Sequence, residues 1–321
     1  MILTSTLAEQ ALQLAKEQGF ALAGFTDLNI SQTDKDNIDQ YIEQHRYGEM
    51  VWFPRHQSLR KDPGQMLSYE NQPKPVRAYS ALVLGMIYID RDFEAALLHS
   101  RYRISRYAAG RDYHKVIKKR AEPIADLFQQ AGIDSRICVD SAPVPEKVLA
   151  RNAGLGWRGK HTLIINKDIG SFFVLGVILL SAKLTESEND ELPSFLKPEQ
   201  VDLCRSCRLC IDACPTGALS EYQIDGSKCL SYITIESKSD RNKNIDRKKW
   251  VFGCDICQEV CPYNRSPKGR QIKRTEIDFS PRQIAYQMLS APPTQDEWQL
   301  TAGMPIRRIS FEELQINYKH G

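Results

Sequence analysis

The first 185 residues alternate between helical and strand-like patterns of apolar positions. A first helix is predicted up to Gly19, because its apolar residues recur on one face. They are Leu3, Leu7, Ala11, Leu14 and Ala15. A longer helix is predicted over residues 113–131, followed by Gly132, on the same grounds. Its apolar face consists of Val116, Ile117, Ile124, Leu127 and Phe128.

Apolar runs of strand length lie between and after these helices. Residues 81–89 are predicted to form one strand and residues 136–139 a shorter one. Residues 162–166 and 171–180 flank a Lys-Asp-Ile-Gly turn and are predicted to form a hairpin. Cys138, on the short apolar strand, is expected to be a buried free thiol. The first 185 residues are therefore predicted to form an α/β domain, of α+β type with a mixed sheet.

The pattern changes in the second half of the chain. Residues 186–200 are acidic and then proline-containing, as in a linker. Residues 201–265 contain nearly all of the cysteines, and residues 266–321 are polar and proline-rich with weak helical patches. We therefore divide the chain into an α/β domain at 1–185, a cysteine-rich domain at 186–265 and a C-terminal tail at 266–321.

Eight of the nine cysteines lie between Cys204 and Cys261, in two groups. The first group has the C-x2-C-x2-C-x3-C-P spacing of bacterial two-cluster ferredoxins, in which the fourth cysteine serves the other cluster. The second group ends C-D-I-C-Q-E-V-C-P and has Val251 where a full repeat needs a cysteine, so Cys229 is the simplest replacement. We predict two 4Fe–4S clusters, each with ligands from both cysteine groups. Their ligands would be Cys204, Cys207, Cys210 and Cys261 for the first cluster, and Cys214, Cys229, Cys254 and Cys257 for the second.

Zinc and disulfide bonds are the alternatives for these cysteines. Zinc ribbons pair two C-x2-C knuckles, and tetrahedral zinc needs neither a third cysteine at this spacing nor the C-P ending. Disulfides are disfavoured because the N-terminus lacks the pattern of a secretory signal. Two clusters in one small fold transfer single electrons over short distances, so we expect a protein that handles electrons.

The composition is that of an ordinary soluble protein, with 42% apolar and 26% charged residues. The longest apolar stretch, residues 172–180, is far shorter than the ~20 residues that a membrane helix needs. We therefore expect a cytoplasmic protein without a membrane partner. We also expect it to be a monomer.

Basic residues gather near the cysteines, although the net charge is only +3. Residues 238–249 contain six basic residues against two aspartates, residues 267–274 contain four more, and Arg307 and Arg308 follow. A solvated surface is the alternative reading, but several basic runs around one redox module favour a polyanionic partner such as RNA. The candidate phosphate contacts are Lys238, Arg241, Lys243, Arg247, Lys248 and Lys249.

Two further stretches concentrate polar residues within the α/β domain. They are S-R-Y-A-A-G-R-D-Y-H-K at 105–115, and V-D-S-A-P-V-P-E-K at 139–147 with A-G-L-G-W-R-G-K-H at 153–161. Each has a local explanation: Asp112 would cap the following helix, Asp140 would be a cap past a strand, and Ala-Gly-Leu-Gly would end a helix. Gly154-x-Gly156 is not a dinucleotide-binding fingerprint, because a helix precedes it and a strand follows.

Taken together, these stretches resemble the epoxyqueuosine reductase family. The resemblance includes C-L-S-Y-I-T-I-E after the first cysteine run and extends from the first helix to about Arg308. The family is similar to reductive dehalogenases, which implies a cobalamin-binding α/β domain fused to a ferredoxin-like domain with two 4Fe–4S clusters. It also implies reduction of epoxyqueuosine to queuosine at the wobble position of tRNA, the last step of queuosine synthesis, by cob(I)alamin that the clusters reduce.

The resemblance also implies roles for single residues. Asp140 matches the family's proposed proton donor, and a partly buried carboxyl would keep its proton near neutrality because desolvation raises its pKa. The residues implied to contact cobalamin are Arg60, Ser105, Arg106, Asp112, Tyr113, His114, Asp140, Ser141, Lys160, Ile164, Leu175, Ser231 and Asp255. The expected partners are tRNA carrying epoxyqueuosine and a low-potential electron donor of the flavodoxin or ferredoxin type.

The chain departs from the family pattern in two places. Many members continue with C-terminal helical repeats that help to hold tRNA, whereas this chain ends soon after Arg308. Some relatives have a cysteine in the cobalamin pocket where this chain has Ser105. Two other functions stay open from the sequence: a reductive dehalogenase acting on a small organohalide, and a ferredoxin-type electron carrier.

Overall fold

The computed structural model describes residues 1–68, 76–185, 201–239, 245–265 and 272–321. The linker predicted over 186–200 lies outside these residues. In the described part of the chain, no helix is long and apolar enough to cross a membrane. The principal helices are α1 (Ser5–Glu17), α2 (Gln32–Glu43), α3 (Gln57–Lys61), α4 (Arg91–Leu98), α5 (Tyr113–Gln130), α6 (Glu146–Asn152), α7 (Leu209–Asp212), α8 (Leu230–Ile235), α9 (Ile256–Glu259), α10 (Pro262–Arg265), α12 (Gln283–Met288), α13 (Gln295–Gln299) and α14 (Phe311–His320). The strands are β1 (Leu22–Asp27), β2 (Ser80–Ile87), β3 (Arg103–Ile104), β4 (Ser135–Cys138), β5 (Trp157–Arg158), β6 (Ile164–Ile165), β7 (Phe173–Leu180), β8 (Leu219–Ser220), β9 (Gln223–Ile224) and β10 (Trp250–Phe252).

The main sheet has four strands in the order β1-β2-β7-β4. Every neighbouring pair is antiparallel, so this sheet is antiparallel where the sequence suggested a mixed one. A parallel pairing joins the short strands β3 and β10. All eight residues of β2 are buried, which explains why the sequence there reads as one continuous apolar run. The predicted combination of helices and sheet is confirmed.

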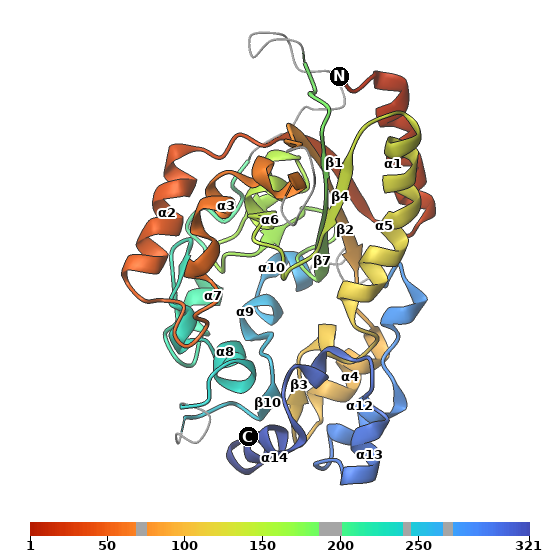
Figure 1. Cartoon of the computed structure of the whole chain (residues 1–321). Coiled ribbons are helices and arrows are strands. Elements are labelled where there is room, and N and C mark those ends of the chain that lie inside the picture. Colours follow the sequence, from red (N-terminus) through yellow and green to blue (C-terminus); the bar gives the residue numbers. More distant parts are fainter. Residues whose placement is uncertain (69–75, 186–200, 240–244, 266–271) are drawn as a thin grey trace.

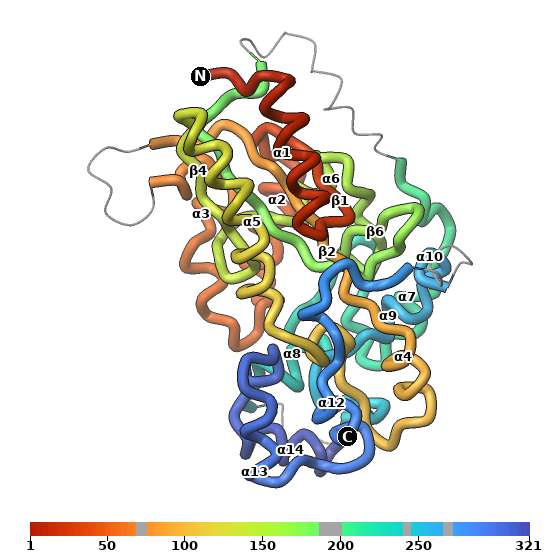
Figure 2. The backbone as a smooth tube through the Cα atoms, turned by 90° about the vertical axis from the view of Figure 1, so that its right-hand side faces the viewer, coloured from red at the N-terminus to blue at the C-terminus, as the bar shows by residue number. Residues whose placement is uncertain are grey.

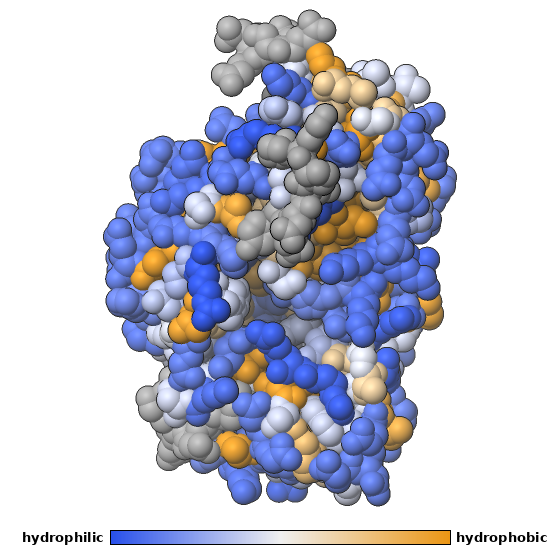
Figure 3. Space-filling view, viewed as in Figure 1, coloured by the Kyte–Doolittle hydropathy of each residue, from blue (hydrophilic) through white to orange (hydrophobic). Residues whose placement is uncertain are grey.

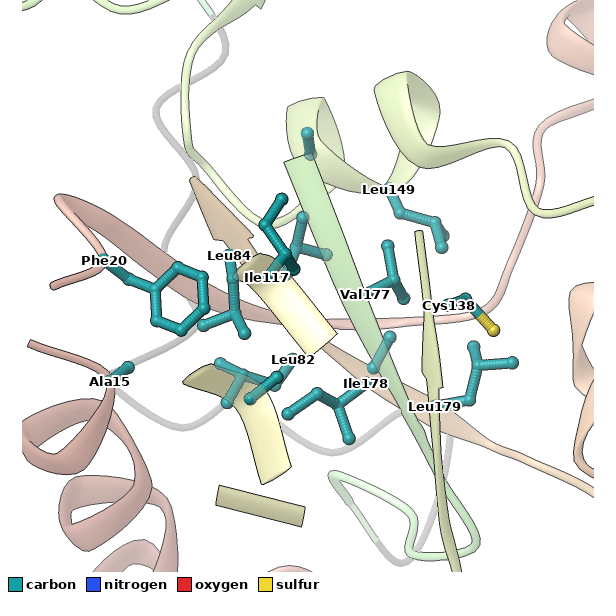
Figure 4. Packing of buried hydrophobic residues seen from close by; sticks show 14 of the residues in the cluster. Ala15, Phe20, Leu82, Leu84, Ile117, Cys138, Leu149, Val177, Ile178 and Leu179 are labelled. Atoms are coloured by element: carbon teal, nitrogen blue, oxygen red, sulfur yellow. The ribbon is translucent and has the colours of Figure 1, made fainter. Parts of the chain in front are cut away.

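Helices cover both faces of this sheet. Helices α1 and α5 lie on one side of it, and α6 lies on the other (Figure 1). The contact with α5 is close, because a Cβ atom added at Gly176 of β7 would lie 2.6 Å from Ile117 Cγ2. Cys138 and Leu149 are among the apolar side chains packed on the sheet (Figure 4), and Cys138 is a buried free thiol as predicted.

The hairpin predicted over residues 162–180 is wrong. Strand β6 pairs with β5, whereas β7 pairs with β2 and β4. The turn itself forms, since Asn166 and Gly170 exchange backbone hydrogen bonds of 2.8 and 2.9 Å. The strands separate because β7 is apolar along its length and gains more from pairing with the eight-residue β2 and the four-residue β4 than with the two-residue β6.

The lower half of the molecule is built from segments that are distant in sequence. Helices α4, α12, α13 and α14 gather below the sheet in both views (Figures 1 and 2). One buried apolar cluster there combines residues from 93–109, 251–252 and 284–318. The segment expected to be a polar tail therefore has its own buried apolar positions. This apolar cluster contains residues from all three predicted segments. The domain boundaries drawn from the sequence stay a prediction.

Asn317, on α14, ties the C-terminal helix to the cysteine-rich segment. Its Nδ2 atom donates to the backbone oxygens of Thr234 (2.8 Å) and Val251 (2.9 Å). The Thr234 hydroxyl in turn accepts a hydrogen bond of 2.9 Å from the backbone N–H of Gly253, which precedes Cys254. Helix α14 thus braces the loop that leads to Cys254.

Candidate active site

A cavity of about 420 Å³ lies where the sheet meets the cysteine-rich segment. Figure 3 shows that the face of the molecule is hollowed near its middle, between the upper and lower halves. The wall of this cavity includes residues predicted to contact cobalamin. They are Ser105, Tyr113, Asp140, Ile164, Leu175, Ser231 and Asp255.

Asp140 follows β4 and projects toward the cavity. Its φ of +47° is in the left-handed region, where Asp and Asn are more common than most non-glycine residues. Its backbone N–H donates a 2.6 Å hydrogen bond to Oε1 of Glu146, at the start of α6. The side chain of Asp140 is 60% exposed because it faces the open cavity. Glu146 therefore fixes a turn that presents the Asp140 carboxylate.

Two side chains from the start of α5 hold that carboxylate. The Tyr113 hydroxyl donates a 2.8 Å hydrogen bond to Asp140 Oδ2, and His114 Nε2 lies 3.1 Å from the same oxygen. His114 Nδ1 lies 2.7 Å from Oδ1 of Asp112, which also caps α5 by accepting from the His114 backbone N–H at 3.0 Å. Asp112 thus caps the helix, as predicted, and also belongs to the chain of hydrogen bonds that reaches Asp140.

This network sets the charges of Asp140 and His114. Partial desolvation by the surrounding protein raises the pKa of Asp140, but hydrogen bonds from His114 and Tyr113 and nearby positive charges outweigh it, so the pKa lies below its ordinary value. Burial lowers the pKa of His114, yet its bonds to Asp112 and Asp140 raise that pKa to about 9. The raised pKa expected for Asp140 is therefore wrong: at neutral pH the two side chains form an ion pair, with the proton on His114.

Glu146 is the carboxyl in this cavity whose pKa is raised. Burial, and then the negative charge of Asp140, raises its pKa to about 8. The pKa of the neighbouring Lys147 is lowered, mainly by desolvation from the protein atoms around it. Glu146 is partly buried and Lys147 is exposed, and both side chains line the cavity. The V-D-S-A-P-V-P-E-K motif contains both Asp140 and Glu146. Its spacing does not show that Glu146 accepts a hydrogen bond from the backbone of Asp140.

The eight predicted cluster cysteines divide between two hollows. The cavity beside Asp140 is also lined by Cys214, Cys229, Cys254 and Cys257. A second hollow of about 210 Å³ is lined by Cys204, Cys207, Cys210 and Cys261. Among the described residues, no three His, Cys, Asp or Glu side chains converge as they would around a single metal ion. The division supports the crossed pairing of the two cysteine groups, with Cys229 as the ligand outside the regular spacing.

Arg106 lies behind the cavity wall. Its guanidinium is buried and lies 2.9 Å from Asp255 and 2.8 Å from Glu259. Ser105 donates its hydroxyl to the same Asp255, and the backbone N–H of Arg106 does so at 2.9 Å. Arg106 therefore orients Asp255 and does not line the cavity itself.

Three further residues predicted to contact cobalamin have other surroundings. Lys160 lines the second hollow, where its Nζ donates to the backbone oxygen of Arg205 at 2.7 Å. The Arg60 guanidinium lies over the ring of Phe53, 4.2 Å from its centroid. Ser141 donates its hydroxyl to the backbone oxygen of Val139, two residues earlier, at 3.3 Å. None of the three is among the side chains that line the cavity beside Asp140.

The predicted phosphate contacts differ in exposure. Lys238, Lys248 and Lys249 are exposed, whereas Arg241 and Lys243 lie outside the described residues. Arg247 is only 1% exposed and donates a 3.0 Å hydrogen bond to Asn317 Oδ1. Arg247 is therefore a buried structural side chain, and its assignment as a phosphate contact is wrong. Local charge in the sequence could not show this, because the burial depends on the distant helix α14.

Two family models match parts of the chain. Residues 203–264 match a 4Fe-4S double cluster binding domain, which confirms the predicted cluster domain. Residues 76–141 match the family described as epoxyqueuosine reductase QueG, DUF1730.

Similar whole chains carry the same description. The epoxyqueuosine reductase of Escherichia coli K12 is 34% identical over 313 residues, which cover 94% of this chain and 77% of that protein. The epoxyqueuosine reductase of Leadbetterella byssophila is 37% identical over 254 residues, 78% of this chain and 77% of that one. Among solved structures, an epoxyqueuosine reductase in complex with an epoxyqueuosine-modified tRNA-Tyr stem loop has a TM-score of 0.73 at 22% identity, covering 98% of this chain and 80% of that one.

Proposed function

Because the chain belongs to the epoxyqueuosine reductase family, we propose that it reduces epoxyqueuosine to queuosine in tRNA. One observation carries the proposal: a single cavity brings together four predicted cluster cysteines and the Asp140 carboxylate with its hydrogen-bond network. Electrons and a proton can therefore reach the same space, as reduction of an epoxide requires.

The overall reaction converts an epoxide into an alkene and releases water. It consumes two electrons and two protons, whereas each iron–sulfur cluster transfers one electron at a time. Cobalamin, the cofactor that the family implies, supplies a strongly reducing nucleophilic centre when it is bound. The chain itself has to bind this cofactor, exclude water and deliver protons.

The cavity fits a corrinoid in its mixture of surfaces. Val174 and Leu175 lie within the central strand β7, yet both are only partly buried, and both line the cavity. With Ile164 they would contact an apolar ring face. Ser231 lies in another part of the wall and would donate a hydrogen bond to a peripheral amide. These residues are the proposed binding contacts.

Asp140 and His114 form the proposed proton-delivery pair. His114 holds a proton near neutrality and lies next to the Asp140 carboxylate, which faces the cavity. When substrate enters and displaces water, desolvation favours the neutral form of Asp140. A proton would then pass from His114 Nε2 to Asp140 Oδ2 and on to the oxygen of the opening epoxide. Tyr113 keeps Asp140 in place through its 2.8 Å hydrogen bond.

The partners proposed for the chain are a tRNA and an electron donor. A wobble nucleoside has to leave the anticodon stack to enter this cavity, as in other enzymes that act on extruded bases. Lys238, Lys248 and Lys249 are exposed candidates for contacts with the phosphates. We also propose that a low-potential donor of the flavodoxin or ferredoxin type reduces the clusters and that the protein acts as a monomer.

The test is conversion of the tRNA itself. Protein purified without oxygen, reconstituted with iron, sulfide and cobalamin, is reduced and mixed with tRNA from cells that lack this protein. Mass spectrometry of the digested tRNA should show queuosine replacing epoxyqueuosine. Protein that shows cluster absorption but binds no corrinoid would indicate an electron carrier. Protein that binds both cofactors and reduces a small organohalide, but leaves the tRNA unchanged, would indicate a dehalogenase.

A further inference from the structure

Trp157 lies in the wall of the hollow that contains Cys204 and Cys261. Its indole Nε1 donates a hydrogen bond of 3.4 Å to the Sγ atom of Cys204. The ring is nearly fully buried and packs edge-on against Tyr263, with 4.8 Å between centroids. Ile165 and Cys261 belong to the same buried group. The indole is therefore held with its N–H directed at a predicted cluster ligand.

His161 follows on the same segment and is only 2% exposed. Its Nδ1 accepts a hydrogen bond of 3.2 Å from the backbone N–H of Leu163. A neutral imidazole that accepts at Nδ1 carries its proton on Nε2. In the described part of the chain this buried Nε2 has no hydrogen-bond partner. Buried N–H groups are rarely left without an acceptor, so an acceptor outside the polypeptide is implied.

The position of the His161 ring suggests which acceptor this is. His161 borders both cysteine-lined hollows. A Cβ atom at Gly159 would lie 3.0 Å from His161 Cε1 and 2.5 Å from Ile165 Cδ1, so the ring edge between the two nitrogens lies beside Ile165. Ile165 lines the smaller hollow, together with Cys204 and Cys261. The His161 ring thus lies in the wall of both hollows, on the side of Gly159 and Ile165.

We propose that Trp157 and His161 donate two N–H···S hydrogen bonds to the cluster held by Cys204, Cys207, Cys210 and Cys261, and that these bonds raise its reduction potential. The proposal rests on the two-cluster domain of the proposed function. Reduction adds negative charge to the cluster sulfurs, and a hydrogen-bond donor stabilises that charge. The two residues would thereby set how readily an external donor can reduce this cluster.

Redox titration monitored by EPR tests the proposal without requiring tRNA turnover. The variants are Trp157→Phe and His161→Phe, which remove one N–H each and keep an aromatic ring, and His161→Gln, which keeps a donor. Trp298→Phe is the matched control, because Trp298 is a buried indole in the apolar cluster of the lower half. A tenfold change in the oxidised-to-reduced ratio corresponds to about 59 mV for one electron. We expect each phenylalanine variant to lower one of the two cluster potentials by roughly this amount.

The same potential should shift in both phenylalanine variants, while His161→Gln and Trp298→Phe should remain near the wild-type value. Histidine-specific ¹⁵N labelling of the wild-type protein gives a second measurement, since a hydrogen-bonded Nε2 should show a hyperfine coupling to the reduced cluster. Iron content and EPR signals of the wild type test the clusters of the proposed function beforehand. With both clusters present, unchanged potentials in the two phenylalanine variants, or shifts in different clusters, would overturn this inference alone.

Discussion

The Asp140→Asn substitution should remove proton delivery while keeping the backbone conformation and the hydrogen bonds at this position. Asparagine has almost the same size as aspartate and also tolerates the left-handed backbone, so the φ of +47° can be kept. Its side-chain oxygen can still accept from Tyr113 and His114, and the backbone bond to Glu146 does not involve the side chain. The variant loses only the negative charge and the ability to carry a proton.

The expected loss follows from the role of a positioned acid. General acid catalysis contributes about 10²–10⁴-fold, so single-turnover conversion of epoxyqueuosine tRNA should slow by that factor. Cluster and corrinoid content should stay at the wild-type level. In the wild type, turnover should fall as the pH rises through about 9, because His114 then loses the proton that it holds next to Asp140. Mass spectrometry of digested tRNA at successive times and pH values measures both effects.

Asp134→Asn is the matched control for this experiment. It makes the same chemical change in an exposed aspartate that precedes β4 and does not line the cavity. We expect this variant to turn over tRNA like the wild type. If Asp140→Asn converts tRNA as fast as Asp134→Asn does, the carboxylate delivers no essential proton and the assignment of the His114–Asp140 pair fails.

Three further predictions concern the clusters, the RNA surface and the buried thiol. Cys229→Ala should destroy one cluster and leave the other assembled; an unchanged iron content and EPR spectrum would show that Cys229 is not a ligand. Replacing Lys238, Lys248 and Lys249 with alanine should weaken tRNA binding and flatten its salt dependence by about 0.7–0.9 logarithmic units per lost phosphate contact. Unchanged affinity and slope in binding titrations would mean that these lysines only face solvent. Burial raises the pKa of Cys138 to about 12, so its thiol should resist iodoacetamide in the folded protein and react after unfolding, as peptide mass spectrometry can establish.

Elements whose sequence pattern is long and local were predictable. Helix α5 and strand β2 formed within two residues of their predicted bounds, because the apolar periodicity of α5 and the continuous apolar run of β2 already show which residues are buried. The hairpin at 162–180 was not predictable from its turn. Its turn residues act locally, whereas the pairing of β7 depends on β2, which is distant in sequence.

In the candidate site, too, features set by neighbouring residues could be predicted, whereas features set by residues distant in sequence could not. Regular spacing indicated seven of the cluster cysteines, and Cys229 could be added because one ligand was missing. The protonation of Asp140 could not be predicted, since it depends on how α5 places His114 and Tyr113 beside the end of β4. Arg247 carries the charge expected of a phosphate contact, but contact with Asn317 removes it from the surface.

Asn317 links the packing of the loop that leads to Cys254 to the order of protein synthesis. Chains emerge from the ribosome N-terminus first, at about 5–20 residues per second, and early domains fold as they appear. The sheet around β2 and β7 can therefore form while the chain is growing, whereas the backbone oxygens of Thr234 and Val251 receive their partner only when α14 has been made. The loop that leads to Cys254, a proposed cluster ligand, therefore reaches its final packing late. A chain that stalls before residue 317 should leave the backbone oxygens of Thr234 and Val251 without these hydrogen bonds.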